Sequence, residues 1–223
     1  MITVHHLENS RSQRVLWLLE ELGLPYELQT YARDARTMLA PPTLLKVHPL
    51  GKSPVITDDG VTVAESGAII EYLVHAHGGG RLRPAVGTEA GRRYTYWLHF
   101  AEGSAMPPLL VRLILDQIRK ARMPFFARPI ARSIADRVDS LFVKPNLARQ
   151  FGFMEAELDG RPWFAGADFS AADIQMSFPL EAAAARAGLD ARFPRLQDWL
   201  ARIHARPAYV RAVARGGPVE VVG

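Results

Sequence analysis

The chain has 223 residues and a formal net charge of +4, and 48% of its residues are hydrophobic. It has no cysteine, which excludes disulfides, thiolate metal sites and a redox dithiol carried by the protein itself. Its basic residues are mostly arginines scattered among acidic residues, so we expect no nucleic-acid partner. No run of about 18 apolar residues is present, so we expect no membrane span. The lack of cysteine and of a signal peptide favours a cytoplasmic location.

Strand and helix patterns alternate over the first 77 residues. A stripe that includes Val15, Leu18 and Leu22 indicates an amphipathic helix that ends at Gly23. The pair Asp59-Gly60 predicts a tight hairpin. We expect strands at residues 2–6, 26–31, 55–57 and 61–64, helices at 12–22 and 66–77, and a short helical segment at 43–47. Because a helix crosses between the first two strands, these should be parallel, and the last two antiparallel.

The rest of the chain predicts helices only. They are expected at residues 88–117, with a break at Pro107-Pro108, at 128–142, 146–158, 171–187 and 194–205, and after Pro207. A glycine-rich segment that begins at Gly78 has the composition of a linker. We therefore expect an α/β domain over residues 1–79, with the order βαβ-α-ββα and a mixed four-stranded sheet, a linker over 80–87, and an all-α domain over 88–223.

The sequence Asn9-Ser10-Arg11-Ser12 lies between the first strand and the first helix. A serine hydroxyl at this point lies where the helix dipole and the free N–H groups favour an anion, such as a thiolate. Ser10 fits best, four residues before the helical Arg14. The alternative is that Ser10 or Ser12 only caps the helix. The motif by itself leaves both interpretations open.

Two further motifs mark the start of helices. Ser66 can cap the helix at 66–77 and leave free N–H groups for a carboxylate, and Glu65 can pair with an amine. The alternative is an ordinary cap beside a solvated acid. Ser170 and Asp173 have the spacing of a capping box, so we assign them a structural role and no catalytic one.

The order of elements and these motifs resemble the cytosolic glutathione transferase superfamily over essentially the whole chain. The likeness is strongest to a bacterial and fungal subgroup typified by a yeast glutathione transferase. The stretches that carry it are His48-Pro49-Leu50-Gly51-Lys52-Ser53-Pro54, Ala64-Glu65-Ser66-Gly67, and Glu102-Gly103-Ser104 with Pro107-Pro108. The resemblance implies a thioredoxin-like N-terminal domain, an all-α C-terminal domain, and glutathione as a consumed co-substrate.

The resemblance also implies the roles of single residues. In serine-type classes a serine hydroxyl, here Ser10, donates to the glutathione sulfur, and Asn9 and Ser12 remain possible substitutes. Other classes use a tyrosine in the first strand, but the first tyrosine here is Tyr26. The peptide bond before Pro54 should be cis, so that the backbone of Ser53 pairs with glutathione as an added strand would. The implied glutathione-binding residues are Ser10, Arg11, Lys52, Ser53, Pro54, Glu65, Ser66 and Glu102.

The first long helix of the C-terminal domain faces the active site in this family. Met106, Leu110 and Leu113 can therefore line a pocket for a hydrophobic second substrate, although such a stripe is also typical of a core. The family pattern implies a homodimer in which Glu102 reaches the partner's glutathione amine. The expected reaction is conjugation of the glutathione thiolate to a hydrophobic electrophile, as in detoxification.

Two other functions remain open. The same site can serve a glutathione-dependent peroxidase or disulfide-bond reductase, in which the sulfur of glutathione itself does the chemistry because the protein has no cysteine. A non-catalytic binding module with the same fold is the second alternative. The histidines His5, His6, His75 and His77 lack the spacing and partners of a metal site, so we expect no metal.

Overall fold

The computed structural model describes residues 1–34, 37 and 39–217. These residues include a four-stranded mixed sheet with the strand order β2-β1-β3-β4. β1 is parallel to β2, whereas β3 is antiparallel to both β1 and β4, which confirms the predicted strand directions. The strands are β1 (Ile2–Leu7), β2 (Tyr26–Tyr31), β3 (Val55–Asp58) and β4 (Val61–Ala64).

Two helices, α1 (Gln13–Leu22) and α2 (Ser66–Ala76), pack on the strands and on each other. The apolar stripe of α1 is buried, and the helix ends at Gly23, whose φ of 63° is a left-handed conformation that glycine adopts without strain. The predicted short helical segment is a 3₁₀ helix, η1 (Pro42–Lys46). The predicted βαβ-α-ββα order and the thioredoxin-like fold are confirmed.

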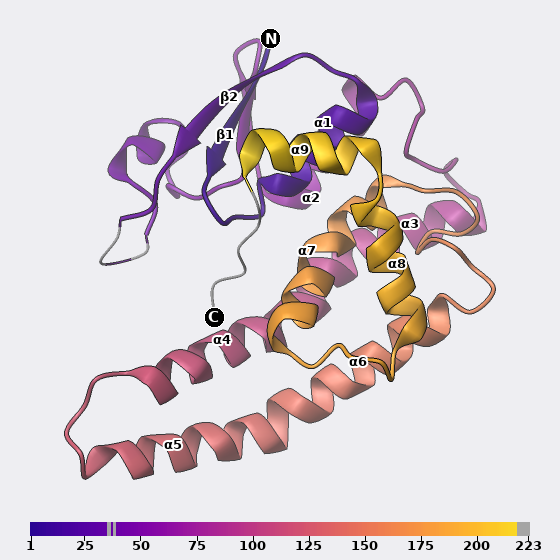
Figure 1. Ribbon diagram of the computed structural model, residues 1–223. Coiled ribbons are helices and arrows are strands. Elements are labelled where there is room, and N and C mark those ends of the chain that lie inside the picture. Colours follow the sequence, from indigo (N-terminus) through magenta and orange to yellow (C-terminus); the bar gives the residue numbers. More distant parts are fainter. Residues whose placement is uncertain (35–36, 38, 218–223) are drawn as a thin grey trace.

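The described chain beyond residue 88 is mostly helical, as predicted, and the only β pairing recorded there is an isolated bridge between Trp163 and Gly166. Its elements are α3 (Glu89–Phe100), the π turn η2 (Ala101–Ala105), α4 (Met106–Lys120), α5 (Ala127–Val138), the π turn η3 (Asp139–Val143), α6 (Lys144–Glu157), α7 (Ala171–Arg186), α8 (Pro194–His204) and α9 (Pro207–Gly216). The last of them, α9, returns to the first part of the chain and packs along α1 (Figure 1).

The predicted break at Pro107-Pro108 is wrong, because the helix continues through the π turn η2 into α4. The predicted separation of helices before residue 146 is wrong for the same reason, since η3 joins α5 to α6 ahead of Pro145. A proline ring clashes with the carbonyl four residues earlier and supplies no N–H. In both continuous helices, α3–η2–α4 and α5–η3–α6, the residue four positions before the proline lies inside the π turn. We therefore infer that the wider turn accommodates the proline ring.

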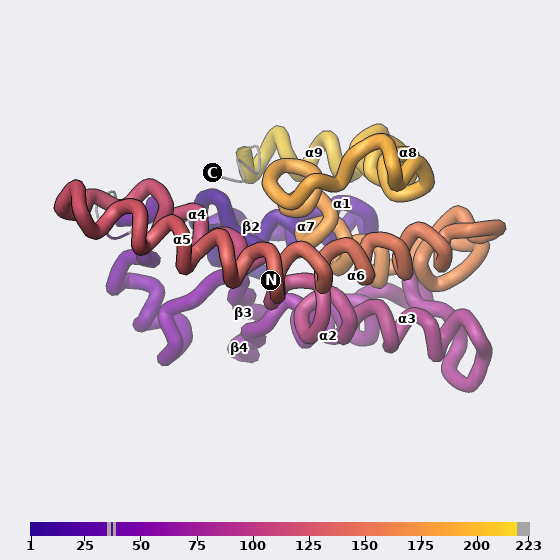
Figure 2. Tube along the Cα trace, turned by 90° about the horizontal axis from the view of Figure 1, so that it is seen from below, coloured from indigo at the N-terminus to yellow at the C-terminus, as the bar shows by residue number. Residues whose placement is uncertain are grey.

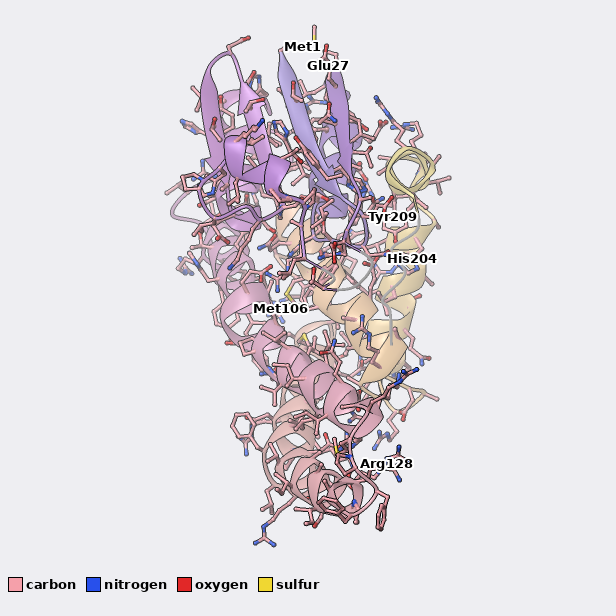
Figure 3. The ribbon with its side chains drawn as sticks, turned by 90° about the vertical axis from the view of Figure 1, so that its left-hand side faces the viewer. Met1, Glu27, Met106, Arg128, His204 and Tyr209 are labelled. Carbon is pink, nitrogen blue, oxygen red and sulfur yellow. The ribbon has the colours of Figure 1, made fainter. Side chains whose placement is uncertain are left out.

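A helical arm, formed by α4 and the antiparallel α5, extends away from the rest of the molecule (Figures 1 and 2). Figure 3 shows Arg128 of the arm at the opposite end of the molecule from Met1. The arm carries many large apolar side chains that are exposed, namely Leu110, Ile114, Ile118, Phe125, Phe126, Ile130, Ile134 and Val138. These side chains leave a large apolar surface without a covering element in the described chain.

One apolar core connects the sheet with the helical part. It includes Trp17 of α1, Ile174 of α7 and Trp199 of α8, all buried. The domain boundaries expected at residues 79 and 88 stay a prediction. Among the residues that the structure describes, no helix is both long enough and apolar enough to cross a membrane.

Candidate functional site

Ser10 lies in the turn between β1 and α1 and is only 6% exposed. Its Oγ is 2.6 Å from Ser12 Oγ and accepts a hydrogen bond from the backbone N–H of Ser12 at 3.2 Å. A third hydroxyl, that of Ser53, is 3.4 Å away. Ser10 therefore accepts from a free N–H at the start of α1, as a capping residue does, although it is not itself the N-cap residue. The N-cap residue of the helix is Ser12, whose own side chain makes no capping bond.

A buried histidine fixes the direction of the hydrogen bonds around Ser10. His6 Nε2 is 2.8 Å from the carbonyl oxygen of Gly216, which can only accept, so Nε2 carries the hydrogen. In a neutral imidazole Nδ1 is then an acceptor, and Ser12 Oγ donates to it at 2.8 Å. Because a hydroxyl has one hydrogen, Ser10 must be the donor in its bond to Ser12. The lone pair of Ser10 is then the part available to a ligand.

The Ser53–Pro54 peptide bond is cis, as expected. The side chain of Ser53, for which the sequence predicts no role, donates to the carbonyl of His5 at 3.0 Å and accepts from the N–H of Leu7 at 3.3 Å. This attaches the loop before β3 to β1, beside Ser10. Lys52 is exposed at the same place.

The prediction that Ser66 caps α2 is wrong. The cap is Glu65, an exposed residue with a φ of 72°, and Ser66 is the first residue of the helix. Ser66 is buried, and its Oγ accepts a hydrogen bond from Arg14 Nη2 at 3.3 Å. The pair nevertheless lies at the N-terminus of α2, where a carboxylate is favoured.

Arg14 is the site residue that the sequence analysis missed. Its side chain is 1% exposed, and its guanidinium donates to Glu102 at 2.6 Å, to the carbonyl of Gln175 at 2.7 Å and to Ser66. Burial lowers the pKa of Arg14, and the carboxylate of Glu102 opposes this. The sequence did contain a sign of this role: Arg14 lies among the apolar residues that form the buried face of α1, and a buried cation needs buried partners.

Glu102 lies in the π turn η2 and also pairs with Arg11, at 3.1 Å. The carboxylate is thus held by two arginines of its own chain, and its expected contact with a partner subunit stays a prediction. Of the expected pocket residues, Met106 is buried, Leu113 is half-buried and Leu110 is 50% exposed. The core interpretation is therefore wrong for Leu110, and the pocket stays a prediction.

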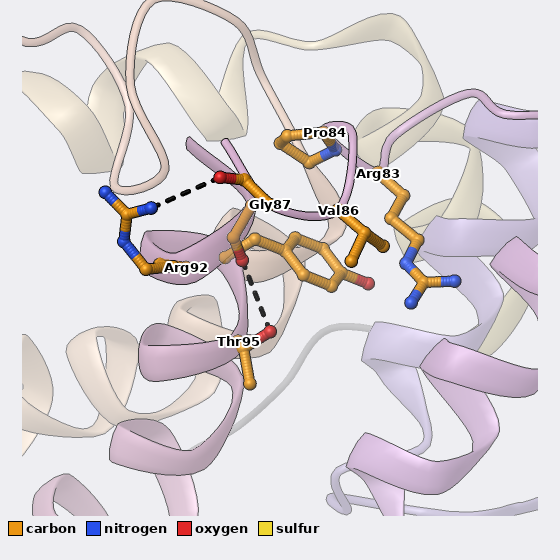
Figure 4. Close-up of a pocket in the computed structure, with 8 residues that line it drawn as sticks. Arg83, Pro84, Val86, Gly87, Arg92 and Thr95 are labelled. Atoms are coloured by element: carbon orange, nitrogen blue, oxygen red, sulfur yellow. Dashed lines mark hydrogen bonds between the residues drawn. The ribbon is translucent and has the colours of Figure 1, made fainter. Parts of the chain in front are cut away.

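A separate cavity of about 330 Å³ lies between residues 83–87 and the first turns of α3 (Figure 4). Its lining, including Arg83, Val86, Arg92 and Thr95, contains none of the expected site residues. In the described part of the chain, no group of three or more metal-ligating side chains could hold an ion. The chemistry-bearing side chains instead gather where β1, α1, α2 and η2 meet.

Comparisons with known proteins find relatives over most of the chain. Family models described as the N-terminal and the C-terminal domain of glutathione S-transferase match residues 10–76 and 118–207. Glutathione S-transferase 3 of Schizosaccharomyces pombe is 38% identical over 209 residues, covering 93% of this chain and 85% of the relative. Glutathione S-transferase 1 of Saccharomyces cerevisiae is 35% identical over 217 residues, covering 94% and 92%.

Solved structures are similar over the same length. A glutathione S-transferase from Actinobacillus pleuropneumoniae has a TM-score of 0.81 and 33% identity, covering 99% of this chain and 95% of that one. A glutathione transferase from Phanerochaete chrysosporium, solved in complex with oxidized glutathione, has a TM-score of 0.76 and 23% identity, covering 98% and 97%. At that identity the second likeness concerns the fold alone.

Proposed function

The chain belongs to the glutathione S-transferase family, an enzyme family that uses glutathione as co-substrate, and we propose that it conjugates the glutathione thiolate to hydrophobic electrophiles. The observation that carries this proposal is the buried hydroxyl of Ser10 at the start of α1, where the helix dipole favours a negative charge. A thiol with a pKa of about 8.5 is mostly protonated at neutral pH, so an enzyme of this kind must stabilise the thiolate.

The described groups suggest how glutathione lies. The γ-glutamyl end is assigned to Glu65 and Ser66 at the N-terminus of α2, where the amine meets Glu65 and the carboxylate meets free N–H groups. The cysteinyl part is assigned to the backbone of Ser53 ahead of the cis Pro54, which brings the sulfur to Ser10. Lys52, which is exposed, and Arg11, which is half-buried and also pairs with Glu102, are assigned to the anionic groups of the peptide.

Replacing Ser10 by alanine should raise the pKa of bound glutathione and slow conjugation near neutral pH by roughly ten- to a hundred-fold, because a hydrogen bond to a charged acceptor is worth about 1.5–3 kcal/mol. The defect should shrink at high pH, where the thiol ionises unaided. Thiolate absorbance titrated against pH in both proteins measures the effect. If the two titration curves coincide while unfolding free energy falls by about 1 kcal/mol, Ser10 only caps the helix.

Two alternatives use the same fold. A peroxidase or disulfide-bond reductase would consume peroxides or disulfides with glutathione but leave general electrophiles unmodified. A non-catalytic module would fail with every substrate, and the hydrogen bonds of Arg14 to Glu102 and Ser66 would then serve stability alone. Retention on immobilised glutathione followed by assays with an aryl halide, a hydroperoxide and a disulfide separates the three.

We further expect a homodimer in the cytoplasm. The exposed apolar surface of the helical arm, with Leu110, Ile114 and Ile130, supports self-association, since a monomer seldom exposes so many large apolar side chains together. The cysteine-free composition supports the compartment. Sedimentation at micromolar concentration should give twice the 24.7 kDa of one chain. A mass of one chain would contradict the dimer.

A further inference from the structure

Four groups form an unbroken row from the site of the sulfur into the protein interior. Ser10 Oγ is 2.6 Å from Ser12 Oγ, which is 2.8 Å from His6 Nδ1, and His6 Nε2 is 2.8 Å from the carbonyl of Gly216. We propose that this row is a proton relay in which His6 takes up the proton of the glutathione thiol through Ser12 and Ser10. The inference rests on the proposed function, because it needs the glutathione sulfur beside Ser10.

The direction of the hydrogen bonds makes the relay necessary for Ser10 to donate. While His6 is neutral, Ser12 donates to His6 and Ser10 donates to Ser12, so both hydroxyl hydrogens point inward. Ser10 then offers the sulfur a lone pair, which can accept from a thiol S–H but cannot stabilise a thiolate. If Ser10 is to donate to a thiolate while both inner hydrogen bonds are kept, every hydrogen bond of the row must change its direction.

The reversal moves one proton along each bond. The thiol hydrogen passes to Ser10 Oγ, the hydrogen of Ser10 passes to Ser12 Oγ, and the hydrogen of Ser12 passes to His6 Nδ1. The S–H bond breaks, an N–H bond forms, and the products are a thiolate and an imidazolium. Each hydroxyl ends with one hydrogen, now pointing outward, and Ser10 donates to the thiolate. After the thioether leaves, the row returns its proton to water or to the leaving group.

The surroundings keep His6 neutral until the sulfur arrives. The side chain is buried, and burial lowers its pKa, while the bond to Gly216 and the more distant Glu8 act in the opposite direction. The cations on the helices packed around β1 are engaged elsewhere. Arg14 of α1 is bound to Glu102, and Arg215 of α9 faces Glu20. On the β2 side the register partner of His6 is the uncharged Thr30.

Gly216 holds the imidazole in the tautomer that the relay needs. A Cβ at this position would lie 2.5 Å from Gln13 Oε1 and 2.5 Å from Leu16 Cδ1, at the ends of two α1 side chains, and 3.2 Å from His6 Cε1, so a larger residue would require these side chains to shift. In the present packing the carbonyl of Gly216 accepts from Nε2 at 2.8 Å. With that bond in place, Nδ1 is left as the acceptor that faces Ser12.

The test compares glutathione with S-methylglutathione, which has no thiol proton, on the full chain at pH 7. Histidine NMR signals report the charge of His6, identified by its absence in His6→Phe, and thiolate absorbance reports the sulfur. Glutathione should convert His6 to imidazolium as the thiolate forms, whereas S-methylglutathione should bind and leave His6 neutral. His6→Phe should raise the thiol pKa by about one unit, a tenfold loss of thiolate, because the row then ends without a group that takes up the proton.

His5 supplies the matched control. It is the neighbouring residue of β1, and its nitrogens face Tyr31 Oη at 2.9 Å and Thr57 Oγ1 at 3.4 Å, away from the row. His5→Phe should leave the thiol pKa unchanged. Thiolate formation with His6 still neutral overturns the relay but leaves the proposed function standing. Binding of neither ligand overturns both.

Discussion

Asp173→Ala should lower the free energy of unfolding by about 4 kcal/mol, because it leaves three buried N–H donors without an acceptor, each costing about 1–3 kcal/mol before relaxation. The donors are the backbone N–H groups of Phe164 at 3.0 Å and Ser170 at 3.0 Å, and Trp199 Nε1 at 3.1 Å. The carboxylate therefore joins the start of α7 to α8 and to the loop before it. Urea unfolding followed by tryptophan fluorescence measures the loss.

Asp168→Ala is the control for this experiment, since the same loop exposes that side chain and its removal should cost less than about 0.5 kcal/mol. The difference between wild type and Asp173→Ala should depend on pH. Burial raises the pKa of Asp173 from 3.8 to about 6 despite its donors, so the folded state binds the proton more tightly than the unfolded state. The difference should therefore grow as pH falls from about 6 to about 4. A cost that is small and independent of pH would contradict this role.

Arg14→Met should lower the free energy of unfolding by about 3 kcal/mol, because breaking a buried ion pair by removing one partner leaves the rest uncompensated. Methionine keeps an unbranched apolar stem like that of arginine but leaves Ser66 Oγ and the Gln175 carbonyl without their donor. Glutathione affinity should fall as well, since Arg14 holds the first residue of α2 in place. Urea unfolding and calorimetric titration with glutathione give the two quantities.

Arg11→Met is the matched control, because it removes a second arginine from the same carboxylate of Glu102. Arg11 is 36% exposed and lies 3.1 Å from that carboxylate, so solvent already screens the pair and the cost should stay within about 1 kcal/mol. Equal effects of the two substitutions would show that the burial of Arg14 does not matter.

Local patterns predicted most of the fold. Strands β2 and β4 begin and end where their patterns do, and most other boundaries differ by one or two residues, because alternation and helical periodicity report which side of each segment is buried. The sequence could not predict the two π turns. The pair Pro107-Pro108 predicts a break, and the patterns on either side of residues 143–145 predict separate helices, whereas the structure forms a wider turn at both places.

The sequence could predict those residues of the candidate site that belong to one local motif. It could not predict contacts between residues that are far apart in the chain. Ser10 and Ser53, from two of the motifs, lie 3.4 Å apart at the ends of neighbouring elements, and Ser66 is the first residue of α2. Arg14 donates to the carbonyl of Gln175, 161 positions away in the chain, and His6 to that of Gly216, 210 positions away. No spacing rule reaches so far, and a lone histidine on a strand reads as an ordinary buried side chain.

The hydrogen bond between His6 and Gly216 joins a residue that is synthesised early to one that is synthesised late. A ribosome adds roughly 5–20 residues per second, so the strand that carries His6 is synthesised well before α9. Until α9 packs on α1, Nε2 has no carbonyl to hold it, and the imidazole is free to exchange between its two neutral tautomers. The newly made chain can thus form its sheet early and still lack an ordered set of protons beside Ser10. If the proposed relay operates, activity therefore begins only after α9 has been released from the ribosome and has packed on α1.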